Sequence, residues 1–217
     1  MIEILPAILA HDEAEFMKKV DRVRSLGAML HIDVMDGNFV KNKTWSPADR
    51  MRYLLDGVPF EAHLMVSNPE HAAPIWLACG ASRVIFHVET TTKESLICRA
   101  TAEECENLAL AINPDTPISR LTPLLDTFKQ VMVMGVTPGW SGQPFQQIAL
   151  EKIAMLKSLR PSIKIIVDGG VKPENAAVIA AAGADVLVAG SALTDHPDPA
   201  EAYMALKTSV HGRTLGI

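Results

Sequence analysis

The segment His31-Ile32-Asp33-Val34-Met35-Asp36-Gly37 places polar residues at the end of an apolar run that we expect to form a β-strand. Two further apolar runs end in the same way, at residues 60–65 (FEAHLM) and 165–170 (IIVDGG). Because side chains alternate along a strand, His31 and Asp33 share one face. Polar ends of strands so distant in the chain converge on one point only if the sheet closes. The pattern therefore favours a closed barrel over an open doubly wound sheet.

Apolar runs alternate with segments of helical period along the whole chain, which is typical of βαβ units and a parallel sheet. The eight expected strands are Ile4–Leu9, Met29–Val34, Phe60–Met65, Arg83–Val88, Leu108–Ile112, Val131–Val136, Ile163–Val167 and Val186–Ala189. The eight expected helices lie near Asp12–Ser25, Pro47–Leu55, Pro69–Cys79, Lys93–Glu104, Pro117–Phe128, Gln147–Leu159, Pro173–Ala182 and Pro199–Lys207. This order predicts the α/β class, as a (β/α)8 TIM barrel in which residues 1–217 form a single domain.

Composition and charge exclude several classes of protein. The net charge is −5 and no stretch is rich in Lys and Arg, so we expect no nucleic-acid partner. No apolar run approaches the roughly 18 residues of a membrane-spanning helix, and we find no secretory signal. The three cysteines, Cys79, Cys98 and Cys105, lack C-x-x-C spacing, so we expect reduced thiols. These features predict a cytoplasmic protein that does not associate with membranes.

Four chemically active residues fall at the carboxyl ends of three expected strands: His31, Asp33, His63 and Asp168. Taken singly, such a histidine is more often a hydrogen-bonded core residue, and such an aspartate is more often a cap or turn residue. All four fall at the end of the barrel where enzymes of this fold keep their active sites. Two neutral imidazoles and two carboxylates suit a divalent cation that keeps open positions for substrate oxygens. We therefore expect one divalent metal ion.

Glycine-rich segments follow the last three expected strands, at residues 135–143, at Gly169-Gly170 and at Gly190-Ser191. Glycines let backbone N–H groups approach an anion closely. Any one of these loops is explained equally well as a tight turn between a strand and a helix. Three in succession favour a phosphate site, because loops after strands seven and eight commonly bind phosphate in this fold.

Six motifs, in this order and at these spacings, resemble the ribulose-phosphate 3-epimerase family over nearly the whole chain. They are HIDVMDGNFV at 31–40, HLMV at 63–66, INPDTP at 112–117, MGVTPGWSGQPF at 134–145, VDGGV at 167–171 and VAGSAL at 188–193. The resemblance implies that His31, Asp33, His63 and Asp168 bind one metal ion, most often zinc or iron, with manganese or cobalt as alternatives. It also implies that Asp33 and Asp168 are the catalytic base and acid.

The resemblance further implies a small phosphorylated ketose as substrate, with its C3 proton removed and returned through an enediolate. The implied substrate and phosphate contacts are His63, Gly139, Trp140, Ser141, Gly142, Gly169, Gly170, Gly190 and Ser191. The segment at residues 138–145 is expected to act as a lid. Members of the family are most often homodimers, so a homo-oligomer is expected here.

Further residues are expected to line the pocket: Ala7, His11, Met35, Met65 and Met134. The methionines would exclude water, although ordinary core packing explains them equally well. The family usually carries serine where this chain has Ala7 and Ala10. We hypothesise that His11 partly replaces the lost hydrogen bond, although a neutral surface role explains His11 equally well. For His87, at the end of the fourth expected strand, a structural role is favoured over a place in the pocket.

Several functions are compatible with these residues. The first is interconversion of D-ribulose 5-phosphate and D-xylulose 5-phosphate. The same chemistry on a hexulose phosphate such as D-allulose 6-phosphate is the alternative, because the chain deviates from the family in the region that would report sugar length. A phosphosugar-binding paralogue without catalysis is a third reading. Aldol or decarboxylation chemistry is disfavoured, since the Asp-x-Lys-x-x-Asp pattern of such barrels is absent from residues 33–36.

Overall fold

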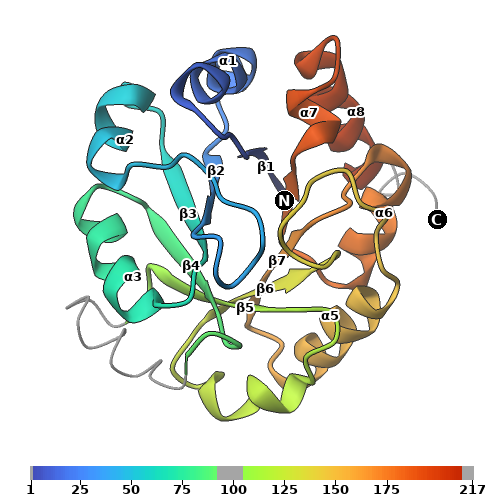
Figure 1. Ribbon diagram of the computed structural model, residues 1–217. Helices are drawn as coiled ribbons and strands as arrows, with labels where there is room; N and C mark the ends of the chain where they lie inside the picture. The colour runs from blue at the N-terminus through green and yellow to red at the C-terminus, as the bar shows by residue number, and fades with distance from the viewer. Residues whose placement is uncertain (1, 92–104, 212–217) are drawn as a thin grey trace.

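The computed structural model describes residues 2–91 and 105–211, in which eight parallel strands close into a barrel surrounded by helices (Figure 1). The strands follow one another around the barrel in sequence order, and β1 also pairs with β8. Their bounds are β1 Glu3–Ile8, β2 Leu30–Met35, β3 Phe60–Met65, β4 Arg83–His87, β5 Leu108–Ile112, β6 Gln130–Met134, β7 Lys164–Asp168 and β8 Val186–Ala189. The predicted (β/α)8 barrel is confirmed.

The α-helices of the described residues lie outside the barrel (Figure 1). They are α1 Glu13–Val23, α2 Ala48–Leu55, α3 Pro69–Ala78, α5 Ile148–Leu159, α6 Pro173–Ala182, α7 Ser191–Thr194 and α8 Pro199–His211. Short 3-10 helices are η1 Arg24–Leu26, η2 Ile118–Arg120 and η3 Thr122–Leu124. The helix expected over Lys93–Glu104 lies outside the described residues.

One predicted helix is wrong, and one helix was not predicted. The segment Pro117–Phe128 forms the 3-10 helices η2 and η3 instead of one α-helix. Pro123 has no backbone N–H to donate to an earlier carbonyl, so a continuous α-helix through it would lose a hydrogen bond. The single-turn helix α7 directly after β8 was missed because four residues carry too little periodicity to be recognised.

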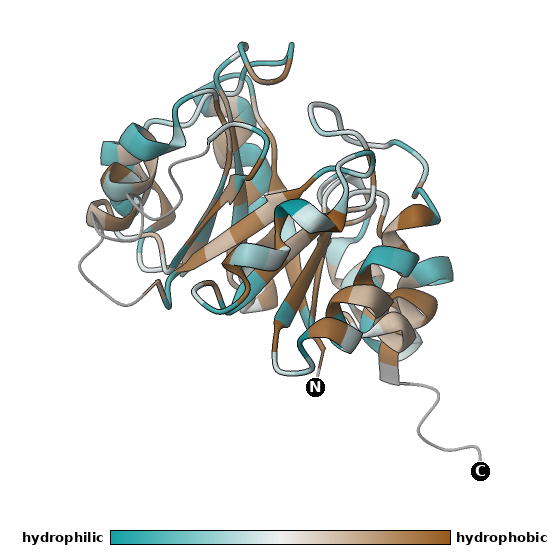
Figure 2. Ribbon diagram, turned by 90° about the horizontal axis from the view of Figure 1, so that it is seen from below, coloured by the Kyte–Doolittle hydropathy of each residue, from teal (hydrophilic) through white to brown (hydrophobic). Residues whose placement is uncertain are grey.

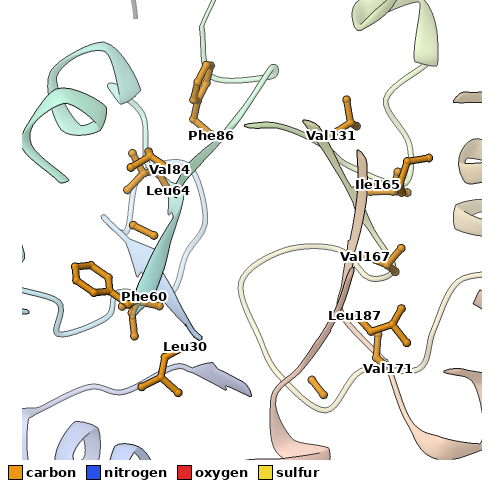
Figure 3. Packing of buried hydrophobic residues seen from close by; sticks show 14 of the residues in the cluster. Leu30, Phe60, Leu64, Val84, Phe86, Val131, Ile165, Val167, Val171 and Leu187 are labelled. Atoms are coloured by element: carbon orange, nitrogen blue, oxygen red, sulfur yellow. The ribbon is translucent and has the colours of Figure 1, made fainter. Parts of the chain in front are cut away.

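The apolar core has two layers that follow from the alternation of side chains along the strands. One layer fills the barrel itself with residues such as Leu5, Ile85, Met132 and Ile166. The other lies between the barrel and the helices, and Figure 3 shows side chains of β3, β4, β6 and β7 pointing away from the barrel interior. Colouring by hydropathy shows the strands as largely hydrophobic (Figure 2). The barrel is therefore a packed scaffold that can hold polar groups rigidly at one end.

Two expectations from the composition can be compared with the structure. Among the described residues no helix has both the length and the apolar character that crossing a membrane requires. Cys79 is a free thiol, as expected, but Cys105 is disulfide-bonded. The expectation of reduced thiols is therefore wrong for Cys105, because cysteine spacing in the sequence carries no signal of a pairing in space.

Candidate active site

Four side chains from three strands converge at the carboxyl end of the barrel interior. Strand β2 contributes His31 and Asp33, β3 contributes His63, and β7 contributes Asp168. The strand register places Asp33 beside His63. Each residue offers one ligand atom, and these four atoms all lie within 4.8 Å of one another. None of the four residues is more than 8% exposed, so the cluster is shielded from bulk water.

The distances within this cluster show how the polar atoms face one another. Asp33 Oδ1 lies 3.2 Å from Nδ1 of His63 and 3.5 Å from Nε2 of His31. Asp168 Oδ2 lies 3.4 Å from Nδ1 of His63 and 3.9 Å from Nε2 of His31. This Nε2 atom is buried and has no hydrogen-bond partner among the described residues. An unpaired buried nitrogen is costly, and a divalent cation would satisfy it, so the donor set fits one metal ion.

The electrostatics of the cluster favour positive charge between the carboxylates. Burial disfavours the charged form of His31, but the nearby carboxylates of Asp33 and Glu61 outweigh it and raise its pKa to about 10. Burial is likewise overcome at His63, where Asp168 and Asp33 raise the pKa. The pKa of Asp33 is lowered, because contacts with both histidines outweigh the effect of burial. The same negative potential that holds protons on the imidazoles would attract a metal ion.

A buried ion pair lies on the far side of His31 from this cluster. Nδ1 of His31 is 2.5 Å from Oε1 of Glu61, and Arg83 donates through Nε to Oε2 of Glu61 at 2.7 Å. Both Glu61 and Arg83 are buried. Neither residue is among those predicted from the sequence, although Glu61 stands two residues before His63 and therefore shares its face of β3.

His63 is held by a different pair of residues. Its Nε2 lies 2.9 Å from Nε2 of His87, and Nδ1 of His87 lies 3.2 Å from Oε2 of Glu89. Glu89 also accepts a hydrogen bond from the backbone N–H of Asn113 at 2.8 Å. Burial opposes ionisation of Glu89, but the contact with His87 and the other hydrogen bonds lower its pKa to about 2. His87 therefore contacts His63 and does not line the cavity described below.

A cavity opens above the cluster and brings together most of the residues predicted for the pocket. Asp33 and Asp168 reach it, whereas the two histidines lie below its lining. The other predicted residues that line it are Ala7, Met35, Met65, Met134, Gly139, Trp140, Ser141, Gly142, Gly169, Gly170, Gly190 and Ser191. Leu9 and Lys172 also line the cavity, although the sequence does not predict them there. The cavity thus connects the two aspartates of the cluster with the glycine-rich loops.

Two of these glycines leave no room for a side chain. Gly170 has a φ of +70°, and a Cβ there would lie 2.8 Å from the backbone N and Cα atoms of Phe145. Gly169 has a φ of +100°, and a Cβ there would lie 2.5 Å from the side chain of Val136. Only glycine permits this conformation and this close approach, which leave the peptide groups bare at the cavity wall. Such exposed backbone is suited to an anion.

Two predicted residues have environments that the sequence did not reveal. His11 is exposed and lies outside the cavity lining, with Nδ1 3.0 Å from the carbonyl oxygen of Lys43. Trp140 lines the cavity but is 60% exposed. Its loop is tied down by the buried Asn42, which donates to the carbonyl oxygen of Gly139 at 2.9 Å.

Comparisons of the sequence with a family model and with curated proteins point to the same family. The sequence model that describes the "Ribulose-phosphate 3 epimerase family" matches residues 3–194 of this chain. Ribulose-phosphate 3-epimerase of Schizosaccharomyces pombe is 36% identical over 213 residues, covering 96% of this chain and 93% of the relative. The chain belongs to the ribulose-phosphate 3-epimerase family. The protein of that name from Serratia marcescens is 36% identical over 202 residues, covering 90% of this chain and 96% of the relative.

The family match confirms the resemblance that the six motifs predict. Ribulose-phosphate 3-epimerases are carbohydrate epimerases, a class of isomerase. Solved structures add the fold. The 3-hexulose-6-phosphate synthase from Salmonella typhimurium superposes with a TM-score of 0.73 at 16% identity, covering 96% of this chain and 98% of that one. Orotidine 5'-phosphate decarboxylase from Pyrococcus horikoshii has a TM-score of 0.67 at 20% identity, covering 96% and 99%. At these identities the likeness concerns the barrel alone.

Proposed function

We propose that the protein is a metal-dependent 3-epimerase that interconverts D-ribulose 5-phosphate and D-xylulose 5-phosphate. The observation that carries the proposal is that Asp33 and Asp168 come from different strands, lie close together and both reach one cavity. Inverting a carbon beside a ketone requires one group that removes its proton and another that delivers a proton to the opposite face. Two carboxylates at one cavity are suited to these two roles.

His31, Asp33, His63 and Asp168 would hold one divalent ion, whose charge the two carboxylates balance. Bound there, the ion would supply a Lewis acid that stabilises the negative charge created when the C3 proton leaves. We propose zinc or iron, with manganese or cobalt as alternatives, because imidazole and carboxylate ligands suit all four metals.

The chain's own side chains then divide the work. Asp33 takes the C3 proton in one direction and Asp168 returns one to the other face, with the roles exchanged in the reverse direction. Met35, Met65 and Met134 line the cavity and keep water from the enediolate. The backbone around Gly139–Gly142, Gly169–Gly170 and Gly190–Ser191 binds the phosphate. The loop at residues 138–145 covers the bound sugar.

One observation favours a second substrate. Ala7, which stands where the family usually has serine, lines the cavity and cannot donate a hydrogen bond to the sugar. The same reaction on a hexulose phosphate such as D-allulose 6-phosphate is therefore the second candidate. A phosphosugar-binding paralogue that has lost catalysis is the alternative that the experiment below excludes or establishes.

We also propose, from the family and the composition, that residues 1–217 form one domain that works in the cytoplasm as a homodimer without nucleic-acid partners. The dimer follows from the resemblance set out in the sequence analysis, and the net charge of −5 supports the absence of nucleic acid. Size-exclusion chromatography with light scattering would give the mass of the assembly. A monomeric mass would overturn the proposed dimer.

The reaction is tested with metal-loaded protein and D-ribulose 5-phosphate in heavy water, with C3 followed by NMR. Epimer formation together with deuterium at C3 is expected. D-allulose 6-phosphate, run in parallel, ranks the two substrates by kcat/KM. Binding of either sugar without deuterium at C3 would mean that catalysis has been lost and would overturn the proposal.

A further inference from the structure

The buried pair Glu61 and Arg83 has no part in the proposed reaction, yet it lies directly against His31. Glu61 is fully buried and Arg83 is 5% exposed, so neither charge is stabilised by water. Buried charges of this kind are costly unless they are paired and hydrogen-bonded. Their position inside the barrel, next to a candidate metal ligand, calls for a function.

Arg83 fixes the orientation of the Glu61 carboxylate. Both Nε and Nη2 of Arg83 donate to Oε2 of Glu61. Arg83 Nη1 donates to Oε1 of Gln130 at 2.7 Å, and Gln130 Nε2 donates to the carbonyl oxygen of Glu106 at 2.7 Å. Because a guanidinium has only donors, the group that faces it at Oε2 must be an acceptor. The remaining oxygen of Glu61 is thereby directed at His31.

The contact with Glu61 determines which nitrogen of His31 carries the proton when the ring is neutral. A carboxylate paired with arginine offers only acceptors, so Nδ1 of His31 must donate to Oε1 across their 2.5 Å contact. Nε2 is then left with a free lone pair. This is the atom that faces Asp33 and Asp168 and has no partner among the described residues.

We propose that Glu61 and Arg83 are a positioning pair, which holds His31 in the Nδ1–H tautomer and so presents Nε2 to a divalent ion. The inference rests on the metal site of the proposed function. Histidines that bind metals commonly donate their other N–H to a carboxylate, which orients the ring and makes the ligand more basic. Here Arg83 holds that carboxylate in place.

The variant Glu61→Gln tests the pair because the amide has an oxygen that only accepts and an NH2 group that only donates. Arg83 requires the acceptor, so the new NH2 group must point at Nδ1 of His31. Nδ1 then has to accept, and the proton moves to Nε2, where the metal should bind. We expect the affinity for Zn²⁺ to fall about 10–100-fold, the range for losing such a partner.

The double variant Glu61→Gln, Arg83→Met separates this mechanism from a packing defect. Without Arg83 the amide is free to turn its oxygen to His31, which restores the Nδ1–H tautomer. Zinc affinity should return to within about fivefold of the wild type, although two buried residues have been changed. A purely structural role of the pair would make the double variant bind no better than the single one.

A matched control removes the same charge from another Glu–Arg pair. Glu13 forms two hydrogen bonds of 2.7 Å with Arg50 on the surface. The variant Glu13→Gln therefore changes the same groups away from the cluster. It should bind Zn²⁺ as tightly as the wild type.

Zinc affinity is measured on the full chain by competition with a chromophoric chelator at one fixed pH near neutrality. NMR of zinc-loaded protein labelled with ¹⁵N at histidine reports whether Nδ1 of His31 carries the proton.

Lower affinity of Glu61→Gln, with recovery in the double variant, supports the proposal. Unchanged affinity of Glu61→Gln, or no recovery, overturns it. If Glu61→Gln does not fold, the double variant decides alone, because it must bind nearly as the wild type does. A wild type that binds no zinc overturns the proposed metal site instead.

Discussion

Replacing Gly170 with alanine should damage both stability and substrate binding. The residue has a φ of +70°, where a non-glycine residue costs about 1–2 kcal/mol. The new methyl group would also lie 2.8 Å from the N and Cα atoms of Phe145, well inside an ordinary contact of about 3.5–4.0 Å. Forcing a group into a packed site adds about 1–3 kcal/mol. We therefore expect a loss of about 2–5 kcal/mol in the free energy of unfolding.

A control is provided by Gly27, which has a φ of +65° but nothing within 4 Å of a built Cβ. Gly27→Ala should cost only the conformational part, about 1–2 kcal/mol, and leave KM unchanged. Gly170→Ala should also raise KM about tenfold or more, because the displaced backbone of Phe145 ends the loop that forms the cavity wall. Urea unfolding and steady-state kinetics measure both effects. Equal destabilisation by the two variants would refute the reasoning from close contact.

Three other variants test separate parts of the account. Asp168→Asn should lower deuterium exchange at C3 at least about 100-fold, because an amide cannot act as acid or base; exchange at the wild-type rate would remove Asp168 from the reaction. Ala7→Ser should lower KM for D-ribulose 5-phosphate about 2–10-fold if its hydroxyl gains one hydrogen bond with the sugar; an unchanged KM would show that the cavity is complete without it. Asp36 has a lowered pKa, because hydrogen bonds from Ser67 and from the N–H groups of Asn38 and Phe39 outweigh burial. With the folded pKa below the unfolded value of about 3.9, this stability is present above that pH and lost as pH falls below it. In urea unfolding the wild type should be more stable than Asp36→Asn by a constant amount from neutral pH down to about pH 5, and the difference should shrink below about pH 4. A difference independent of pH would contradict the assignment.

The barrel and the cluster of two histidines and two aspartates could be predicted, because both follow from the alternation of side chains along each strand. His31 and Asp33 share a face of β2, and His63 lies opposite Asp33 in the strand register. The same alternation could have placed Glu61 near the cluster, since Glu61 and His63 share a face of β3. The position of its partner Arg83 could not be predicted. Arg83 lies beside Glu61 because of the register between β3 and β4, and the sequence alone does not determine that register.

The errors have equally specific causes. The apolar period of residues 117–128 predicts one α-helix, but Pro123 lies inside this segment and has no backbone N–H to donate, and two 3-10 helices form instead. Of the two roles open to His11, the structure favours the one on the surface, because its ring faces the carbonyl of Lys43. Lys172 was not predicted to line the cavity, because loop conformation decides which side chains reach it.

The central claim is that His31, Asp33, His63 and Asp168 share one ion. X-ray absorption of zinc-loaded protein tests it directly. Multiple scattering from imidazole rings reports how many histidines bind the metal, and the first shell gives the total number of nitrogen and oxygen neighbours. The account predicts one zinc per chain with two imidazole nitrogens and the remaining ligands oxygen, and the loss of one imidazole in His63→Ala. A spectrum with no imidazole, or one that His63→Ala leaves unchanged, would contradict it.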